Sequence, residues 1–170
     1  MFSSIIQRIA SSFNGSGKKS GKIIMLYTSK SSCGYADMVE TLKEAELTSR
    51  RSNVSVVELS INSKSFTSIG EALGRVKVGS EDIILIGRGG GDISHCTFNA
   101  FKSNHAAVAL RQYRSKGAKI VTGVGHHGDN FAVDKAANYS ECTPTAAANR
   151  VIKLLNGSES KSKFTFAGRG

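Results

Sequence analysis

The sequence contains no tryptophan, a single proline and only three cysteines among its 170 residues. The cysteines, Cys33, Cys96 and Cys142, are odd in number and show no CxxC spacing. This pattern favours a reducing compartment, and it indicates neither a disulfide framework nor a zinc site. Apolar runs long enough to cross a bilayer are also missing, which excludes a transmembrane helix.

Acidic residues are scarce. The chain has 13 Asp and Glu and 23 Lys and Arg, which gives a formal net charge of +10. A chain this basic favours polyanionic partners, nucleic acid first, although a solvated basic surface or tail would give the same balance. Hydrophobic residues make up 39% and charged residues 21% of the chain. These proportions are ordinary for one soluble globular domain of this length.

The first 21 residues differ in composition from the rest of the chain. Their apolar residues fall on one face of a predicted helix, namely Phe2, Ile5, Ile6, Ile9 and Phe13. No acidic residue precedes Asp37, a composition that suits either an organellar transit peptide or a helix that docks on the domain or on a partner. We favour docking and a cytoplasmic protein, with the mitochondrial matrix as the alternative if residues 1–21 are a transit peptide. The end of this segment, `NGSGKKSG`, is typical of a flexible basic linker.

From residue 22 onward, strand and helix patterns alternate along the chain. Strands are predicted at 22–28, 54–61, 82–87 and 119–124. Helices are predicted at 34–49, 67–76, 98–116 and 143–157, the last with a Thr143 cap followed by Pro144. The alternation predicts an α/β domain over 22–157, with a Rossmann-like open, mainly parallel sheet of about four or five strands and helices on both faces. A polar tail over 158–170 completes the chain.

The third predicted strand ends in an unusual way, in `DIILIGRGGGD` (82–92). In an open parallel sheet, ligands bind beyond the carboxyl ends of the strands. Gly89, Gly90 and Gly91 would let backbone N–H groups turn toward phosphate oxygens, and Arg88 adds a planar fork suited to a phosphodiester. The alternative is a tight turn beside a surface charge.

The fourth predicted strand ends in `KIVTGVGHHGD` (119–129). A histidine has an ordinary pKa of about 6.5, so His126 suits proton transfer near neutrality, and Asp129 could fix the orientation of its ring. Asp37 follows the first strand and would bring a second carboxylate to the same edge. A metal site made of His126, His127 and Asp129 is the alternative, although adjacent histidines rarely bind the same ion.

Together these motifs resemble the catalytic domain of the exonuclease VII large-subunit family. The family's arginine with three glycines, followed by Phe-Asn, matches Arg88–Gly91 and Phe98–Asn99. The stretch `TSKSSCGYADMVETL` (28–42) resembles its Thr-Ser segment leading to an aspartate, here Asp37. Its Gly-His-x-x-Asp segment, later aspartate and Thr-Pro match Gly125, His126, Asp129, Asp134, Thr143 and Pro144. The resemblance covers residues 22–150 and does not include the family's OB-fold or its long C-terminal helical region.

The resemblance implies an exodeoxyribonuclease-like hydrolase that cleaves phosphodiester bonds of single-stranded DNA. It implies that no metal or other cofactor is required. The expected partners are single-stranded nucleic acid, DNA rather than RNA, and a small subunit or another protein. The implied catalytic residues are Asp37, Arg88, His126 and Asp129. The implied phosphate- or substrate-binding residues are Gly89, Gly90, Gly91, Ser29, Asn99, His127 and Thr143.

A division of roles follows from the chemistry of these side chains. Arg88 and the glycine N–H groups would stabilise charge on the phosphoryl oxygens. His126 would transfer a proton or act as the nucleophile, oriented by Asp129, and Asp37 would be the second acid or base.

Three segments depart from the family pattern. The stretch `DISHCTFN` lacks the family's acidic pair, `NSKSFTSIG` replaces a Val-Gln-Gly stretch, and Asn138–Ser140 stands where the family has Asp-x-Arg. These departures keep open a non-catalytic nucleic-acid-binding subunit that retains the phosphate cradle. A nucleotide-binding domain for a small ligand is a third interpretation, but no acidic ribose-binding residue is placed for it.

Overall fold

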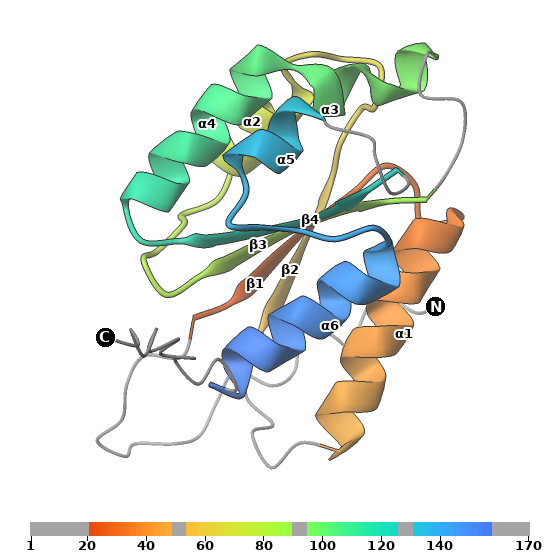
Figure 1. Cartoon of the computed structure of the whole chain (residues 1–170), viewed down its shortest axis with the longest axis vertical. Coiled ribbons are helices and arrows are strands. Elements are labelled where there is room, and N and C mark those ends of the chain that lie inside the picture. The colour runs from red at the N-terminus through yellow and green to blue at the C-terminus, as the bar shows by residue number, and fades with distance from the viewer. Residues whose placement is uncertain (1–20, 49–53, 90–94, 126–130, 158–170) are drawn as a thin grey trace, which may run out of the picture.

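The computed structural model describes residues 21–48, 54–89, 95–125 and 131–157. Within them, all strands belong to one parallel sheet with the order β2-β1-β3-β4-β5 (Figure 1). The strands are β1 (Ile23–Tyr27), β2 (Val56–Ser60), β3 (Ile83–Arg88), β4 (Lys119–Val124) and β5 (Tyr139–Ser140). The predicted open, parallel, Rossmann-like sheet is therefore confirmed.

Helices cover both faces of the sheet, as predicted (Figure 1). One face carries α1 (Cys33–Thr48) and α6 (Pro144–Leu155), which pack against each other. The other face carries α2 (Ser68–Gly74), α3 (Asn99–Lys102), α4 (Asn104–Ser115) and α5 (Ala132–Ala136). A short 3₁₀ helix, η1 (Cys96–Phe98), precedes α3.

The central strands are buried on both faces, which explains their continuous apolar sequences. Side chains alternate along β1, so that Ile24 and Leu26 join the core beneath α2 to α5, whereas Ile23 and Met25 join the core beneath α1 and α6. The same alternation holds in β3. The sheet is thus the middle layer of three.

The single long helix predicted over 98–116 is wrong. The chain forms η1, α3 and α4 instead, and Ser103 interrupts the helical path with an extended backbone. The Ser103 hydroxyl accepts a hydrogen bond from the Ala106 N–H and donates one to the Phe66 carbonyl. Ser103 is therefore the N-cap of α4, and a new helix begins at a position where the apolar periodicity predicted one continuous helix.

Two short elements, α5 and β5, were not predicted. The first has five residues and the second only two, too few to show a periodic pattern. Strand β5 is held by Asn138, whose side-chain oxygen accepts a hydrogen bond from Ile120 N–H and whose own N–H donates to the Ile120 carbonyl. A side-chain contact to a distant strand therefore forms this edge of the sheet.

None of the helices in the described part of the chain is long and apolar enough to span a membrane. The amphipathic helix predicted within residues 1–21 and the tail over 158–170 lie outside the described residues. Their boundaries with the domain remain predictions.

Candidate active site

The strand order defines where a ligand would bind. From β1 the chain crosses to β2 on one side, and from β3 it crosses to β4 on the other side. The carboxyl ends of β1 and β3 therefore lie next to each other at the point where the order reverses, which is the usual ligand site of open α/β sheets. Arg88 is the last residue of β3, and its neighbour across the sheet is Val124, directly before Gly125.

The guanidinium of Arg88 is held in place by three contacts. Its Cζ atom lies 3.5 Å from the centroid of the Phe98 ring. Its Nη1 donates to the Gly89 carbonyl at 3.2 Å and its Nη2 donates to the Thr97 hydroxyl at 3.0 Å. Burial lowers the pKa of Arg88, but a guanidinium remains charged at any physiological pH. The site therefore contains a half-buried, oriented positive charge.

The residues that hold Arg88 come from the segment after the glycines. His95 begins this segment by capping η1, with its Nδ1 accepting from the Thr97 N–H at 3.4 Å. Phe98 is fully buried and stacks on Phe131, with ring centroids 5.3 Å apart and planes 1° from parallel. Phe98 belongs to the family motif, but the motif gives it no role, and the sequence carries no signal for Thr97 or Phe131.

Helix α1 approaches the end of β3 very closely. A Cβ atom built on Gly34 would lie 2.6 Å from the Gly89 nitrogen and 3.2 Å from the Arg88 carbonyl carbon. Only a glycine permits this approach, because any side chain would collide with backbone. Asp37 follows one turn later and is half-buried, and Met38 next to it packs over Gly87. The structure thus places Asp37 on the helix that contacts the Arg88 end of β3.

Ser29 lies in the exposed turn between β1 and α1. Its hydroxyl hydrogen-bonds that of Ser31 at 2.8 Å, and its carbonyl accepts from the Ser32 hydroxyl at 2.7 Å. Ser32 in turn accepts from the Tyr35 N–H and supports the first turn of α1. Ser29 therefore lies just beyond the carboxyl end of β1, and its role in binding substrate stays a prediction.

Asn99 and Thr143 make structural contacts. The Asn99 amide donates to the Lys64 carbonyl at 3.2 Å and ties α3 to the loop after β2. The Thr143 hydroxyl accepts from the Ala146 N–H at 3.1 Å, which confirms the predicted cap of α6. Both hydrogen bonds are explained by folding alone, so their predicted contact with substrate stays a prediction.

Five of the predicted site residues lie outside the described residues, namely Gly90, Gly91, His126, His127 and Asp129. The ends of the histidine segment are described. Gly125 is buried with a φ of +81°, a backbone conformation that favours glycine, and Phe131 is buried in the stack with Phe98. The histidine segment therefore follows the end of β4 at Val124, beside Arg88, and precedes Phe131 at the start of α5.

Among the described residues, no group of three or more His, Cys, Asp or Glu could hold a metal ion. The alternative metal ligands, His126, His127 and Asp129, lie outside this set. The expectation of metal-free chemistry is thus still a prediction.

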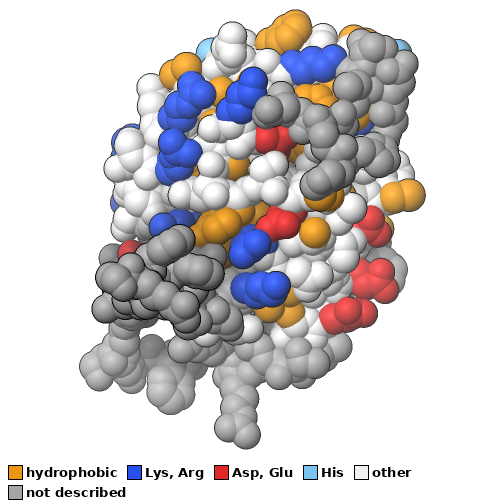
Figure 2. All heavy atoms as spheres, viewed as in Figure 1, with side chains coloured by type: hydrophobic (Ala, Val, Ile, Leu, Met, Phe, Trp, Pro, Cys, Tyr) orange, Lys and Arg blue, Asp and Glu red, His pale blue; other side chains and the backbone are white. Residues whose placement is uncertain are grey.

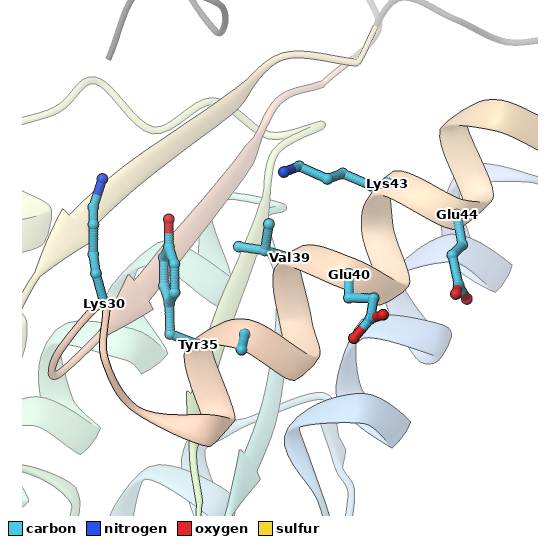
Figure 3. A pocket seen from close by; sticks show the side chains of 7 residues that line it. Lys30, Tyr35, Val39, Glu40, Lys43 and Glu44 are labelled. Carbon is cyan, nitrogen blue, oxygen red and sulfur yellow. The ribbon is translucent and has the colours of Figure 1, made fainter. Parts of the chain in front are cut away.

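A shallow groove with a volume of about 420 Å³ runs along the outer side of α1. Its charges oppose each other, because Lys30 forms an ion pair with Glu58 at 2.9 Å and the groove is lined by Lys43, Glu40 and Glu44. Figure 3 shows the two glutamates projecting from a different side of α1 than Lys43. The groove therefore presents no surface of one sign to a charged ligand.

Comparison with known proteins identifies the family to which this chain belongs. The family model for the exonuclease VII large subunit matches residues 18–164. The chain belongs to this family. The match spans the whole described sheet and includes Gly34, Arg88 and Phe98.

Individual relatives agree with this assignment. The exodeoxyribonuclease 7 large subunit of Pseudothermotoga lettingae is 30% identical over 140 residues, which cover 78% of this chain and 32% of that protein. The Acholeplasma laidlawii large subunit is 30% identical over 128 residues, 75% of this chain and 27% of the relative. The Clostridium botulinum large subunit is 43% identical over 76 residues, 45% and 18% respectively. The chain thus spans about a third or less of these relatives.

Proposed function

We propose that this chain is an exodeoxyribonuclease-like hydrolase that cleaves phosphodiester bonds of single-stranded DNA. The observation that carries the proposal is the fixed guanidinium of Arg88 at the carboxyl end of β3, in a chain that belongs to a nuclease family. A planar, charged fork that is held from behind by an aromatic ring suits the two non-bridging oxygens of a phosphodiester.

The proposed catalytic residues are Asp37, Arg88, His126 and Asp129. Arg88 and the N–H groups of the glycine segment would neutralise charge that develops on the phosphoryl oxygens. His126 would remove a proton from the attacking water or attack phosphorus itself, with its ring oriented by Asp129. Asp37 would protonate the leaving oxygen as the P–O bond breaks. No metal is needed in this scheme.

The proposed partners follow from the same reasoning. Single-stranded nucleic acid, DNA rather than RNA, is the expected ligand of a basic chain in this family, and a small protein subunit is the expected second partner. Figure 2 shows Lys and Arg side chains over the α4 side of the molecule, whereas Asp and Glu gather over α1. The cytoplasm is the proposed compartment, because Cys33, Cys96 and Cys142 are exposed and are not joined in disulfides.

The test is digestion of end-labelled single-stranded DNA, with and without EDTA. The wild type, His126→Ala and a control, His105→Ala, would be purified in parallel. His105 is an exposed histidine of α4 whose ring lies over Gly70, so its removal leaves the proposed chemistry untouched. We expect EDTA-resistant cleavage by the wild type and His105→Ala, and none by His126→Ala.

Other outcomes are equally informative. Cleavage that EDTA abolishes would replace the metal-free scheme with a metal-dependent one. Binding of single-stranded DNA without cleavage by any variant would support the second candidate, a non-catalytic nucleic-acid-binding subunit. Equal activity of the wild type and His126→Ala would remove His126 from the site.

A further inference from the structure

We propose that Phe98 and Phe131 are positioning residues that hold the Arg88 guanidinium in the orientation needed to bind phosphate oxygens. This inference rests on the proposed function, since it assigns Arg88 to the phosphodiester. It concerns two aromatic residues that lie 33 positions apart, and their order in the sequence does not reveal that they meet.

The three side chains form a continuous stack. Phe98 contacts both other members, with the Arg88 Cζ 3.5 Å from its centroid and the Phe131 centroid 5.3 Å away in a plane 1° from parallel. A cation within about 6 Å of a ring centroid is attracted by the ring face, and offset parallel rings are mutually favourable. Because Phe131 fixes the plane of Phe98, it also fixes the plane of the guanidinium.

Stacking leaves the edge of the guanidinium for the substrate. An arginine has five N–H donors that lie in one plane, and the ring contacts the face of that plane. Within the described part of the chain, Gly89 and Thr97 accept two of these hydrogen bonds. The remaining edge can therefore meet phosphate oxygens while the aromatic contact is kept.

Phe131 is itself anchored to the sheet. Its N–H donates to Asp134 Oδ2 at 3.2 Å, and Asp134 Oδ1 accepts from the Thr122 hydroxyl at 2.5 Å. Thr122 is a fully buried residue of β4, and Phe131 is only 4% exposed. A line of contacts thus leads from β4 through α5 to Arg88 on β3. This arrangement gives Asp134, which the sequence singled out only by resemblance, a structural reason to be there.

The chain offers a matched control in Phe101. This residue is fully buried and lies edge-on to Phe98, with centroids 6.2 Å apart, and it belongs to the same core. Phe101→Leu would therefore remove a similar buried volume without touching the stacked face. Phe131→Tyr keeps the stacked ring and serves as the conservative variant.

The first measurement is steady-state cleavage of single-stranded DNA by the full-length chain and its variants, below the melting temperature of each. A misplacement of about 1 Å can cost about a hundredfold in rate, so we expect Phe131→Leu to lower kcat by roughly ten- to a hundredfold with little change in KM. Phe131→Tyr should retain most of kcat. Phe101→Leu should keep wild-type kcat despite a similar loss of melting temperature.

The second measurement does not depend on activity. The Nε–H resonance of Arg88 is followed by nitrogen-15 NMR, before and after addition of a phosphorothioate-linked single-stranded oligonucleotide. Stacking on Phe98 should shift this proton upfield in the wild type and in Phe101→Leu, and the shift should be lost in Phe131→Leu. Addition of the oligonucleotide should move the resonance in the wild type.

The outcomes separate the two proposals. If the wild type does not cleave single-stranded DNA and its Arg88 resonance does not move on addition of the oligonucleotide, the proposed function is overturned. The phosphate-binding role of the stack is then overturned with it. Cleavage by the wild type, with equal kcat losses in Phe131→Leu and Phe101→Leu or an unchanged Arg88 resonance in Phe131→Leu, would overturn the positioning role alone.

Discussion

Arg88 combines a charge with partial burial, and this combination makes its side chain hard to replace. Burial lowers the pKa of Arg88, which means that the surroundings stabilise the charged form less well than water does. The Phe98 face and the Thr97 hydroxyl offset part of that cost. A lysine would present a single ammonium without the planar fork or the stacked face.

We therefore predict that Arg88→Lys lowers turnover of single-stranded DNA by about a hundredfold or more while the affinity for DNA changes little, because the contact matters most when charge develops on phosphate. The measurement is kcat from cleavage and Kd from fluorescence anisotropy with the same oligonucleotide. A proportional loss in both would show that Arg88 only binds substrate. His105→Ala is again the control.

The residues of the site differ in how well they could be predicted from the sequence. Arg88 and its glycines are visible because an apolar strand ends abruptly in an unusual pattern. Phe131 and Thr97 carry no such signal, because an isolated aromatic or threonine after a loop is common. The contact of Thr97 with Arg88 and that of Phe131 with Phe98 depend on how η1 and α5 pack over the sheet.

At the scale of elements, the site depends on the distance between α1 and β3. Gly34 lets the backbone of α1 approach that of Gly89, and the same helix brings Asp37 to this edge. Gly74, at the end of α2, has open space where a Cβ would lie. Substitution by alanine is therefore expected to have opposite effects on stability at Gly34 and at Gly74.

Gly34→Ala should destabilise the fold by about 1–3 kcal/mol and reduce cleavage, because backbone atoms of β3 cannot move aside as a flexible side chain can. Gly74→Ala should be neutral or should stabilise by up to about 1 kcal/mol, since alanine is the better helix former. Urea unfolding followed by circular dichroism gives both free energies. Equal stability of the two variants would contradict the close approach of α1 to β3.

Elements also show the limits of periodicity. Strands β1 to β4 and helices α1, α2 and α6 were predicted within a few residues, because each is long enough for its apolar spacing to be read. The break at Ser103 was not, because the hydroxyl that caps α4 also needs the Phe66 carbonyl, 37 residues away in sequence. The sequence around Ser103 therefore does not predict its hydrogen bond to Phe66.

At the scale of the whole molecule, a partly buried ion pair between Lys22 and Asp82 lies at the amino end of the sheet, opposite the site. Asp82 accepts hydrogen bonds from Lys22 Nζ at 2.7 Å, from Lys22 N–H at 2.9 Å and from Gly79 N–H at 2.8 Å. Burial alone would raise the pKa of Asp82, but the hydrogen bonds from Gly79 and Lys22 outweigh it, so the pKa is lowered below its ordinary value of 3.8. The pair joins the start of β1 to the start of β3.

Because the folded-state pKa is lowered, the charged form of Asp82 stabilises the fold at pH values above 3.8, and this contribution is lost as the pH falls through the lower, folded-state pKa. We predict that Asp82→Asn lowers the free energy of unfolding by about 1–3 kcal/mol at neutral pH, with a difference from the wild type that shrinks in acid. Urea unfolding from pH 7 down to pH 3 measures it. A difference that is independent of pH would rule out the charge as its cause.

The class of fold, the positions of the main strands and the motifs shared with the exonuclease VII large-subunit family could all be predicted from the sequence. These properties are local, because apolar spacing and short motifs are written in consecutive residues. The tertiary structure alone decided the strand order, the meeting of Gly34 with Gly89, and the stack of Arg88, Phe98 and Phe131. These depend on contacts between residues far apart in the chain, which only the packing of helices on both faces of the sheet brings together.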